Sequence, residues 1–307
     1  MRLRRLILVA SAVAAWVTLT ALAAAAEPLA DLTTQPALGP WSLAPGEYYA
    51  ELSGSTLKTD SYFNDDSKRT AAGYLFQDRR VRAGIEMGWK KRWSLQLSLP
   101  LTTVTARDPA GRVTSNAGLE DLGIGLRYRI SNGKGASSLQ LRWEAPAGYN
   151  RTLPMPVGDG LQKLSAALRF GGPAGASGFW QLGAGYRMGF LKFGANGTDE
   201  TESPAQWNWA NHVTVDAAVA HWFRRVQVAA LYGGQFAASS GYAHEIDQHV
   251  AGPRVTYRAD ARLDVFAGSW HTPAGRNAWH ADAYYAGVAW KATKLARNQG
   301  FLGSDAR

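Results

Sequence analysis

Apolar and polar residues alternate along the stretch 81–101, and this pattern recurs through most of the chain. Successive side chains of a strand point to opposite faces, so the apolar residues of such a stretch share one face. The short cationic connection 90–92 divides the stretch into two strands of a hairpin, with Trp89 and Trp93 on either side of it. Tryptophan is enriched at membrane–water boundaries. The pattern therefore predicts a hairpin whose apolar face meets lipid. That face consists of Val81, Ala83, Ile85, Met87, Trp89, Trp93, Leu95, Leu97, Leu99 and Leu101.

Continued along the chain, the alternation predicts about twelve strands, an even number as in bacterial outer-membrane barrels. The predicted connections alternate between long and short. Such barrels have short periplasmic turns and longer external loops, which would place both ends of the barrel in the periplasm. The long connections are predicted at 58–72, 105–118, 148–160, 191–206, 238–249 and 272–278, and the short ones at 90–92, 131–137, 171–178, 224–225 and 259–260.

Composition agrees with a barrel. With 46% hydrophobic residues and a mean hydropathy of −0.23, the chain of 307 residues is too polar for a bundle of membrane helices. A secreted β-sandwich is the alternative, but it does not predict that tryptophans gather in two belts. We therefore predict an all-β, antiparallel, up-and-down transmembrane barrel. The belt beside the short turns comprises Trp89, Trp93, Trp180, Trp222 and Trp290, and the belt beside the long connections comprises Trp207, Trp209, Trp270 and Trp279.

The first 26 residues have the pattern of a secretory signal: a basic start, an apolar middle and small residues before Glu27. An uncleaved anchor is the alternative, since the apolar middle is long. We assign residues 1–26 to a signal peptide, 27–45 to a periplasmic lead-in, 46–290 to the barrel and 291–307 to a C-terminal tail; a short plug in the pore mouth is the alternative for 27–45. The chain contains no cysteine, which excludes a lipoprotein anchor, disulfides and thiolate chemistry.

Three segments carry a family resemblance: PGEYYAELSGSTLKTD, LPLTT and GLEDLGIGLRYRI. They resemble loose strand motifs of the outer-membrane family named for the meta pathway of phenol degradation. The resemblance implies a transporter of hydrophobic or aromatic compounds. The chain departs from the pattern at its end, because Lys291 to Arg307 extend past Trp290 whereas many such barrels finish on an aromatic residue.

Charged residues fall mainly on the face opposite the apolar one, which would line the lumen. Removal of a signal with its three arginines lowers the formal charge from +9 to +6. The lining could act as an electrostatic funnel for anionic solutes, or form Arg–carboxylate pairs that fill the interior. The predicted lumen-lining residues are Arg82, Glu86, Asp121, Arg127, Arg129, Arg142, Glu144, Arg169, Arg187, Asp216, Arg254, Arg258, Arg262 and Asp264.

No catalytic residue, metal site or cofactor is predicted. A lipid-modifying barrel enzyme would need a Ser–His pair, for which His244 with Ser239 or Ser240, and His271 with Ser269, are the candidates. His244, Asp247 and His249 are the weak candidates for a metal site. Acidic clusters that could hold divalent cations or meet lipopolysaccharide are Asp60, Asp65 and Asp66, and Asp199, Glu200 and Glu202.

These patterns together predict a monomeric outer-membrane channel that admits small solutes passively, with Tyr62, Phe63 and Tyr149 as an apolar mouth. The expected partners are outer-membrane lipid, lipopolysaccharide and a small solute of unknown identity. The lack of an aromatic-basic patch or a recognition helix argues against nucleic acid. The alternatives are a lipid-modifying barrel enzyme and a closed structural or adhesive barrel.

Overall fold

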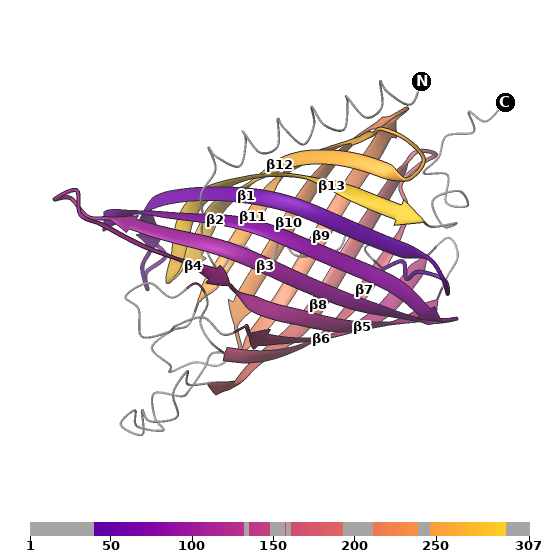
Figure 1. The fold of residues 1–307 in the computed structure, drawn as a ribbon, viewed down its shortest axis with the longest axis horizontal. Coiled ribbons are helices and arrows are strands. Elements are labelled where there is room, and N and C mark those ends of the chain that lie inside the picture. The colour runs from indigo at the N-terminus through magenta and orange to yellow at the C-terminus, as the bar shows by residue number, and fades with distance from the viewer. Residues whose placement is uncertain are drawn as a thin grey trace.

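The computed structural model describes residues 40–131, 135–147, 157, 161–192, 211–238 and 246–292, and strands make up nearly all of this part of the chain (Figure 1). No helix among the described residues is long and apolar enough to cross a membrane. The strands are β1 (Tyr48–Phe63), β2 (Arg69–Lys90), β3 (Trp93–Arg107), β4 (Val113–Leu119), β5 (Asp121–Ser131), β6 (Ala136–Pro146), β7 (Leu161–Pro173), β8 (Gly178–Lys192), β9 (His212–Phe223), β10 (Val226–Ala237), β11 (Asp247–Arg258), β12 (Leu263–Arg276) and β13 (Ala278–Ala292).

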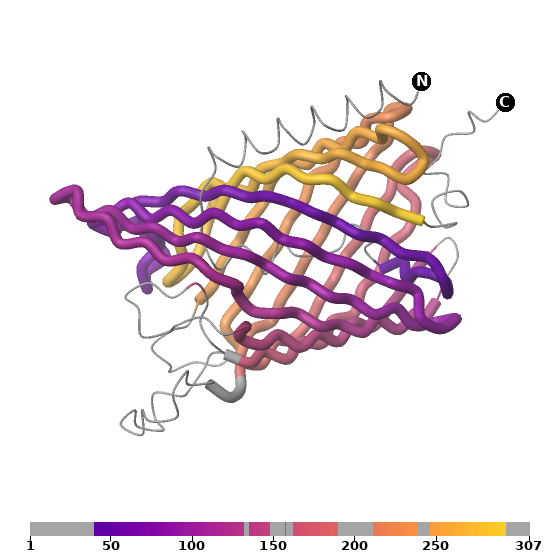
Figure 2. Tube along the Cα trace, in the orientation of Figure 1, coloured from indigo at the N-terminus to yellow at the C-terminus, as the bar shows by residue number. Residues whose placement is uncertain are grey.

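The sheet closes on itself, because β1 pairs with both β2 and β13. All pairings are antiparallel. They join strands that follow one another in the chain, except that β1 pairs with β13 and that β3 pairs with both β4 and β5. These two strands follow one another along β3, on either side of Glu120, and so occupy one position in the wall. The result is a closed barrel of 12 strand positions, whose tilted strands are traced in Figure 2. This confirms the predicted fold class.

The outer wall of the barrel is apolar and the inner wall polar, as the alternation predicts. In β3, Leu97 and Leu101 are 45% and 52% exposed, whereas Gln96 and Ser98, on either side of Leu97, are buried. Closure satisfies the backbone hydrogen bonds between strands, so an apolar outer wall can face lipid without unpaired backbone groups.

Leu97→Arg is expected to destabilise the folded barrel by about 2–4 kcal/mol, because Leu97 is an exposed member of the apolar outer wall and a charge at mid-membrane must be desolvated. Equilibrium unfolding in lipid vesicles measures the change. Val113→Arg is the control, since Val113 is 53% exposed on β4 near the tip of a hairpin, where the expected change is below about 1 kcal/mol. Equal losses for both variants would contradict the assigned apolar wall.

The predicted short connections are confirmed at the end of the barrel that we call the short-turn end: β2 ends at Lys90 and β3 begins at Trp93, and the four others likewise fall between strands. Three predicted long loops, at 58–72, 105–118 and 272–278, are wrong. They are largely strand, closed by tight turns at 64–68, 108–112 and Asn277. Polar residues lie on both faces of these hairpins, so apolar and polar residues no longer alternate there, although the backbone pairing of the strands continues. The predicted loops at 148–160, 191–206 and 238–249 fall mostly outside the described residues.

Three of the tryptophans assigned to the belt beside the short turns are exposed on the outer wall: Trp89 (54%), Trp180 (43%) and Trp290 (53%). Trp93 packs on Tyr128, with ring centroids 4.7 Å apart. The predicted place of Trp222 in this belt is wrong. Its side chain is buried, and the Arg258 guanidinium lies 3.9 Å from its ring centroid. In β9 the outward positions are odd-numbered, so Phe223, at 60% exposure, occupies the membrane-facing place instead.

The predicted belt beside the long connections needs a similar correction. Trp270 is buried in an interior cluster with Leu57 and Val250, and Trp279 stacks on Phe76 with ring centroids 5.5 Å apart. Trp207 and Trp209 lie outside the described residues, as do residues 1–39, which include the assigned signal peptide. At the other end, β13 continues to Ala292, and residues 293–307 of the assigned tail lie outside the described part.

Candidate functional site

The lumen is lined by ion pairs between inward-facing side chains, all of them between different strands except Arg142–Glu144 within β6. Most of the predicted lining residues belong to these pairs. Of the two arrangements that the sequence left open, the described lining therefore has the Arg–carboxylate pairs and not a row of unpaired cations. The pairs are Arg82–Glu51 (3.2 Å), Arg254–Glu51 (3.9 Å), Arg127–Glu86 (3.3 Å), Arg142–Glu144 (2.5 Å), Arg169–Asp216 (3.0 Å), Arg258–Asp264 (3.7 Å), Lys163–Asp121 (3.3 Å) and Lys291–Asp264.

A continuous hydrogen-bonded row joins side chains from five strands of the inner wall: β2, β3, β6, β7 and β9. Gln96 Nε2 donates to Glu86 Oε2 (2.8 Å), Gln140 Nε2 to Gln96 Oε1 (2.9 Å), and Arg169 Nε to Gln140 Oε1 (2.7 Å). Arg169 Nη1 then donates to Asp216 Oδ2 at 3.0 Å. Because each acceptor is satisfied by a donor on another strand, the row holds these side chains in fixed positions across the lumen.

Two glycines make room for this row. A Cβ on Gly183 would lie 2.2 Å from Asp216 Oδ1, and one on Gly125 would lie 2.7 Å from Gln96 Oε1. Any larger residue at either place would therefore push against the side chains that line the lumen. The abundance of glycine thus serves the interior as well as the turns.

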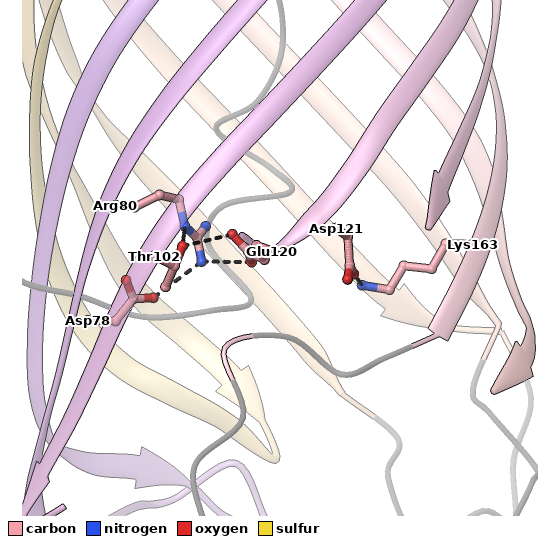
Figure 3. A network of polar contacts seen from close by, with 6 residues as sticks. All are labelled: Asp78, Arg80, Thr102, Glu120, Asp121 and Lys163. Carbon is pink, nitrogen blue, oxygen red and sulfur yellow. Dashed lines mark hydrogen bonds and ion pairs between the residues drawn. The ribbon is translucent and has the colours of Figure 1, made fainter. Parts of the chain in front are cut away.

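A second network lies where β4 gives way to β5 (Figure 3). Glu120, between the two strands, accepts hydrogen bonds from Arg80 Nη2 (2.9 Å) and Thr102 Oγ1 (3.0 Å). Arg80 Nη2 also reaches Asp78 Oδ2 at 3.2 Å. These four side chains are almost fully buried, so the pairs compensate charges that would be costly to bury alone. These contacts join β2 and β3 to Glu120, the residue between β4 and β5.

The segment 40–43, before β1, crosses the barrel at its short-turn end. Trp41 packs edge-on against Phe179, and Leu43 packs with Tyr49 and Phe266, which lie on β8, β1 and β12. Arg127 Nη1 donates to the Trp41 carbonyl oxygen at 3.0 Å, and the Leu43 amide donates to Ser94 Oγ at 3.2 Å. Strands from all sides of the barrel thus hold this segment in the lumen. Residues 40–43, which are assigned to the periplasmic lead-in 27–45, thus lie inside the barrel. Residues 27–39 lie outside the described part.

Three predicted lining residues have other surroundings. Arg262 is exposed in the turn between β11 and β12, outside the lumen, because the strand pairing stops at Arg258–Asp264. Arg129 bends toward the short-turn end and donates to the Lys91 carbonyl oxygen. Arg187 is partly buried, and its Nη1 donates to Gln235 Oε1 at 3.3 Å. Contact between a solute and any of the predicted residues stays a prediction.

Sequence reasoning missed several members of the networks: Glu51, Asp78, Arg80, Glu120, Lys163 and Lys291. Strict application of the two-residue period would have found Glu51, Asp78 and Arg80, which share the inward face with Tyr49 or Arg82. Glu120 could not be found in this way, since it interrupts a strand. Lys291 was missed because the tail was assigned to begin there.

The candidate enzyme residues do not form a recognisable nucleophile–base pair. The candidate His271 has its Nδ1 2.5 Å from Asp282 Oδ1 on the exposed outer wall. Outside the candidate set, His280 Nδ1 lies 3.5 Å from the buried Ser61 Oγ, at the limit of a hydrogen bond. The other candidates, His244 with Ser239 and Ser240, lie outside the described residues. In the part of the chain that the structure describes, no cluster of His, Asp or Glu side chains is arranged to hold a metal ion.

A closed antiparallel barrel with an apolar outer wall and a polar, ion-paired lumen defines the class of outer-membrane β-barrels. Among solved structures, the chain is similar to the COG4313 outer membrane channel from Pseudomonas putida F1, with a TM-score of 0.67 and 13% identity over 84% of this chain and 100% of that one. It is also similar to the NanC porin, with a TM-score of 0.51 and 10% identity over 80% and 100% of the two chains.

These similarities concern the fold, which is that of outer-membrane channels and porins. No protein-family model matches the chain, and no curated protein does. The resemblance to the phenol-degradation family therefore stays a prediction.

Proposed function

We propose that the chain is a monomeric outer-membrane channel for the passive passage of small solutes, and that hydrophobic or aromatic compounds are the solute class. The outward apolar wall supports the membrane location, and the structural similarity to outer-membrane channels supports passage through the lumen. The solute class rests on the resemblance of its strand motifs to the phenol-degradation family. The short-turn end then faces the periplasm, and the hairpins face the exterior, where lipopolysaccharide surrounds the barrel.

The proposal rests above all on the polar side chains that line the lumen and on the segment that narrows it. Charged and amide side chains line it, and the segment 40–43 narrows it at the short-turn end. A paired lining presents both donors and acceptors to a solute, while its small net charge attracts ions weakly. Such a channel conducts by diffusion and requires no energy source.

Loss of the protein is expected to slow the uptake of at least one phenol or aromatic acid, because these solutes would lose their route across the outer membrane. Uptake is compared between a deletion strain and the same strain carrying the gene, and liposomes containing the purified barrel are compared with empty liposomes. Unchanged permeability for every phenol and aromatic acid tested would reject the transport role.

A closed structural barrel is the second candidate, and the ion-paired lumen with the inserted segment 40–43 favours it. Single-channel recording in planar bilayers separates the two. A channel gives discrete conductance steps, whereas a closed barrel gives none over the same range of voltages.

A further inference from the structure

The outer wall changes character over three successive rows of cross-strand neighbours on β13, β1, β2, β3 and β4. The first row is apolar and the next two become polar toward the hairpin end, so the wall leaves the hydrocarbon between the first row and the third. In order, the rows are Ala286, Gly54, Val81, Leu101 and Leu119; then Tyr284, Thr56, Arg79, Thr103 and Ala117; then Asp282, Lys58, Gln77, Thr105 and Ser115.

Two exposed cations stand at this transition. Thr56 pairs with Arg79 and Lys58 pairs with Gln77, so Lys58 and Arg79 are diagonal neighbours on the outward face. Such neighbours have Cβ atoms about 7–8 Å apart, a span over which two long side chains can hold one anionic group. Within the described residues, neither side chain makes an ion pair or a hydrogen bond. Asp282, the nearest carboxylate across the ladder, is engaged by His271 at 2.5 Å.

A groove of about 660 Å³ continues from the third row toward the hairpin tips. Leu75 and Arg107, which line it, form the cross-strand pair on β2 and β3 immediately beyond Gln77 and Thr105. Its other lining residues include two carboxylates, a second arginine, hydroxyl groups and the ring of Tyr74, which is 39% exposed. A carboxylate or a guanidinium group can form hydrogen bonds with two neighbouring hydroxyl groups of one sugar. An aromatic ring can pack against the C–H face of the same sugar.

We propose that this part of the outer wall binds one phosphorylated glycolipid of the outer leaflet. Lys58 and Arg79 hold a phosphate, the apolar row below contacts the acyl chains, and the groove above receives the sugars. The cations lie where the wall leaves the hydrocarbon, which is the level of lipid phosphates, and positive side chains at that level are attracted to anionic headgroups. The inference rests on the proposed outer-membrane location, but not on the solute.

The test uses the purified full chain in detergent, with fluorescent deep-rough lipopolysaccharide as the probe and binding followed by anisotropy. The double variant Lys58→Gln with Arg79→Gln is expected to bind the probe at least about tenfold more weakly, since both charge-assisted contacts are lost. The control is Lys91→Gln with Arg225→Gln, which removes the same charge from exposed positions at the short-turn end; it is expected to bind like the unaltered chain. Dephosphorylated lipopolysaccharide is expected to bind the unaltered chain as weakly as the probe binds the double variant.

A third variant, Tyr74→Ala with Arg107→Gln, tests the groove. It is expected to weaken binding of lipopolysaccharide that carries core sugars, while binding of lipid A alone stays unchanged. Equal binding by the Lys58/Arg79 variant and the unaltered chain, or competition by phosphatidylglycerol as effective as that by lipopolysaccharide, would overturn the proposal. Heat-modifiable gel mobility establishes that each variant is folded. Cell fractionation tests the outer-membrane location separately, and solute uptake is expected to be the same in the double variant.

Discussion

Arg127→Met is expected to destabilise the barrel by about 3–5 kcal/mol, because the substitution leaves a buried carboxylate without its cation. Arg127 and Glu86 form an ion pair at 3.3 Å with side-chain exposures of 0% and 1%. Arg127 also donates to the Trp41 carbonyl, so the same substitution removes one of the contacts that hold the segment 40–43. Urea unfolding in detergent micelles, followed by tryptophan fluorescence, measures the loss.

Two further variants make this prediction specific. Arg112→Met breaks an ion pair with Asp108 in which the arginine side chain is 84% exposed, and it is expected to change stability by less than about 1 kcal/mol. Adding Glu86→Gln to Arg127→Met removes the unpaired charge and keeps an acceptor for Gln96, so part of the stability is expected to return. A loss for Arg127→Met as small as that for Arg112→Met would show that Glu86 is hydrated in the folded barrel.

The closed wall could be predicted from the sequence because lipid imposes a strict rule on it. Every outward residue between the two interfaces must be apolar, so a two-residue period such as Leu95, Leu97, Leu99 and Leu101 identifies both the strand and its lipid-facing side. Beyond the membrane the rule no longer applies. Arg69 to Gly73 continue β2 with polar and small residues on both faces, and nothing in this pattern indicates a strand rather than a loop.

The partners inside the lumen could not be predicted, because parity gives the side of a residue but not its height relative to other strands. Arg80 and Glu120 illustrate this limit: their contact depends on the register between β2 and β3 and on the break between β4 and β5. Trp222 illustrates another limit. Its residue type and its place beside the short turn 224–225 assign it to the membrane boundary, although the period of its own strand places it inside.

The position of residues 40–43 is also invisible in the sequence, since nothing in the pattern before Gly46 distinguishes a tail from an insert. A glycine in the barrel wall indicates the insert instead. Gly88 faces inward, and a Cβ at this position would lie 1.9 Å from the Ala44 carbonyl oxygen. On the same strand and the same face, a Cβ on Gly84 would meet only the Leu97 carbonyl oxygen, at 3.9 Å. Gly88 is thus required by the inserted segment, whereas Gly84 is not.

Gly88→Ala is therefore expected to displace the segment from the lumen and to raise the single-channel conductance, while Gly84→Ala leaves the conductance unchanged. Because the chain has no cysteine and Ser42 is 1% exposed, a Ser42→Cys background reports the displacement directly. Maleimide labelling of that cysteine is expected to be about tenfold faster with Gly88→Ala, as for a local opening made easier by about 1.4 kcal/mol, and unaltered with Gly84→Ala. Faster labelling without a rise in conductance would mean that the hydrogen-bonded row of Glu86, Gln96, Gln140, Arg169 and Asp216, rather than the inserted segment, closes the lumen.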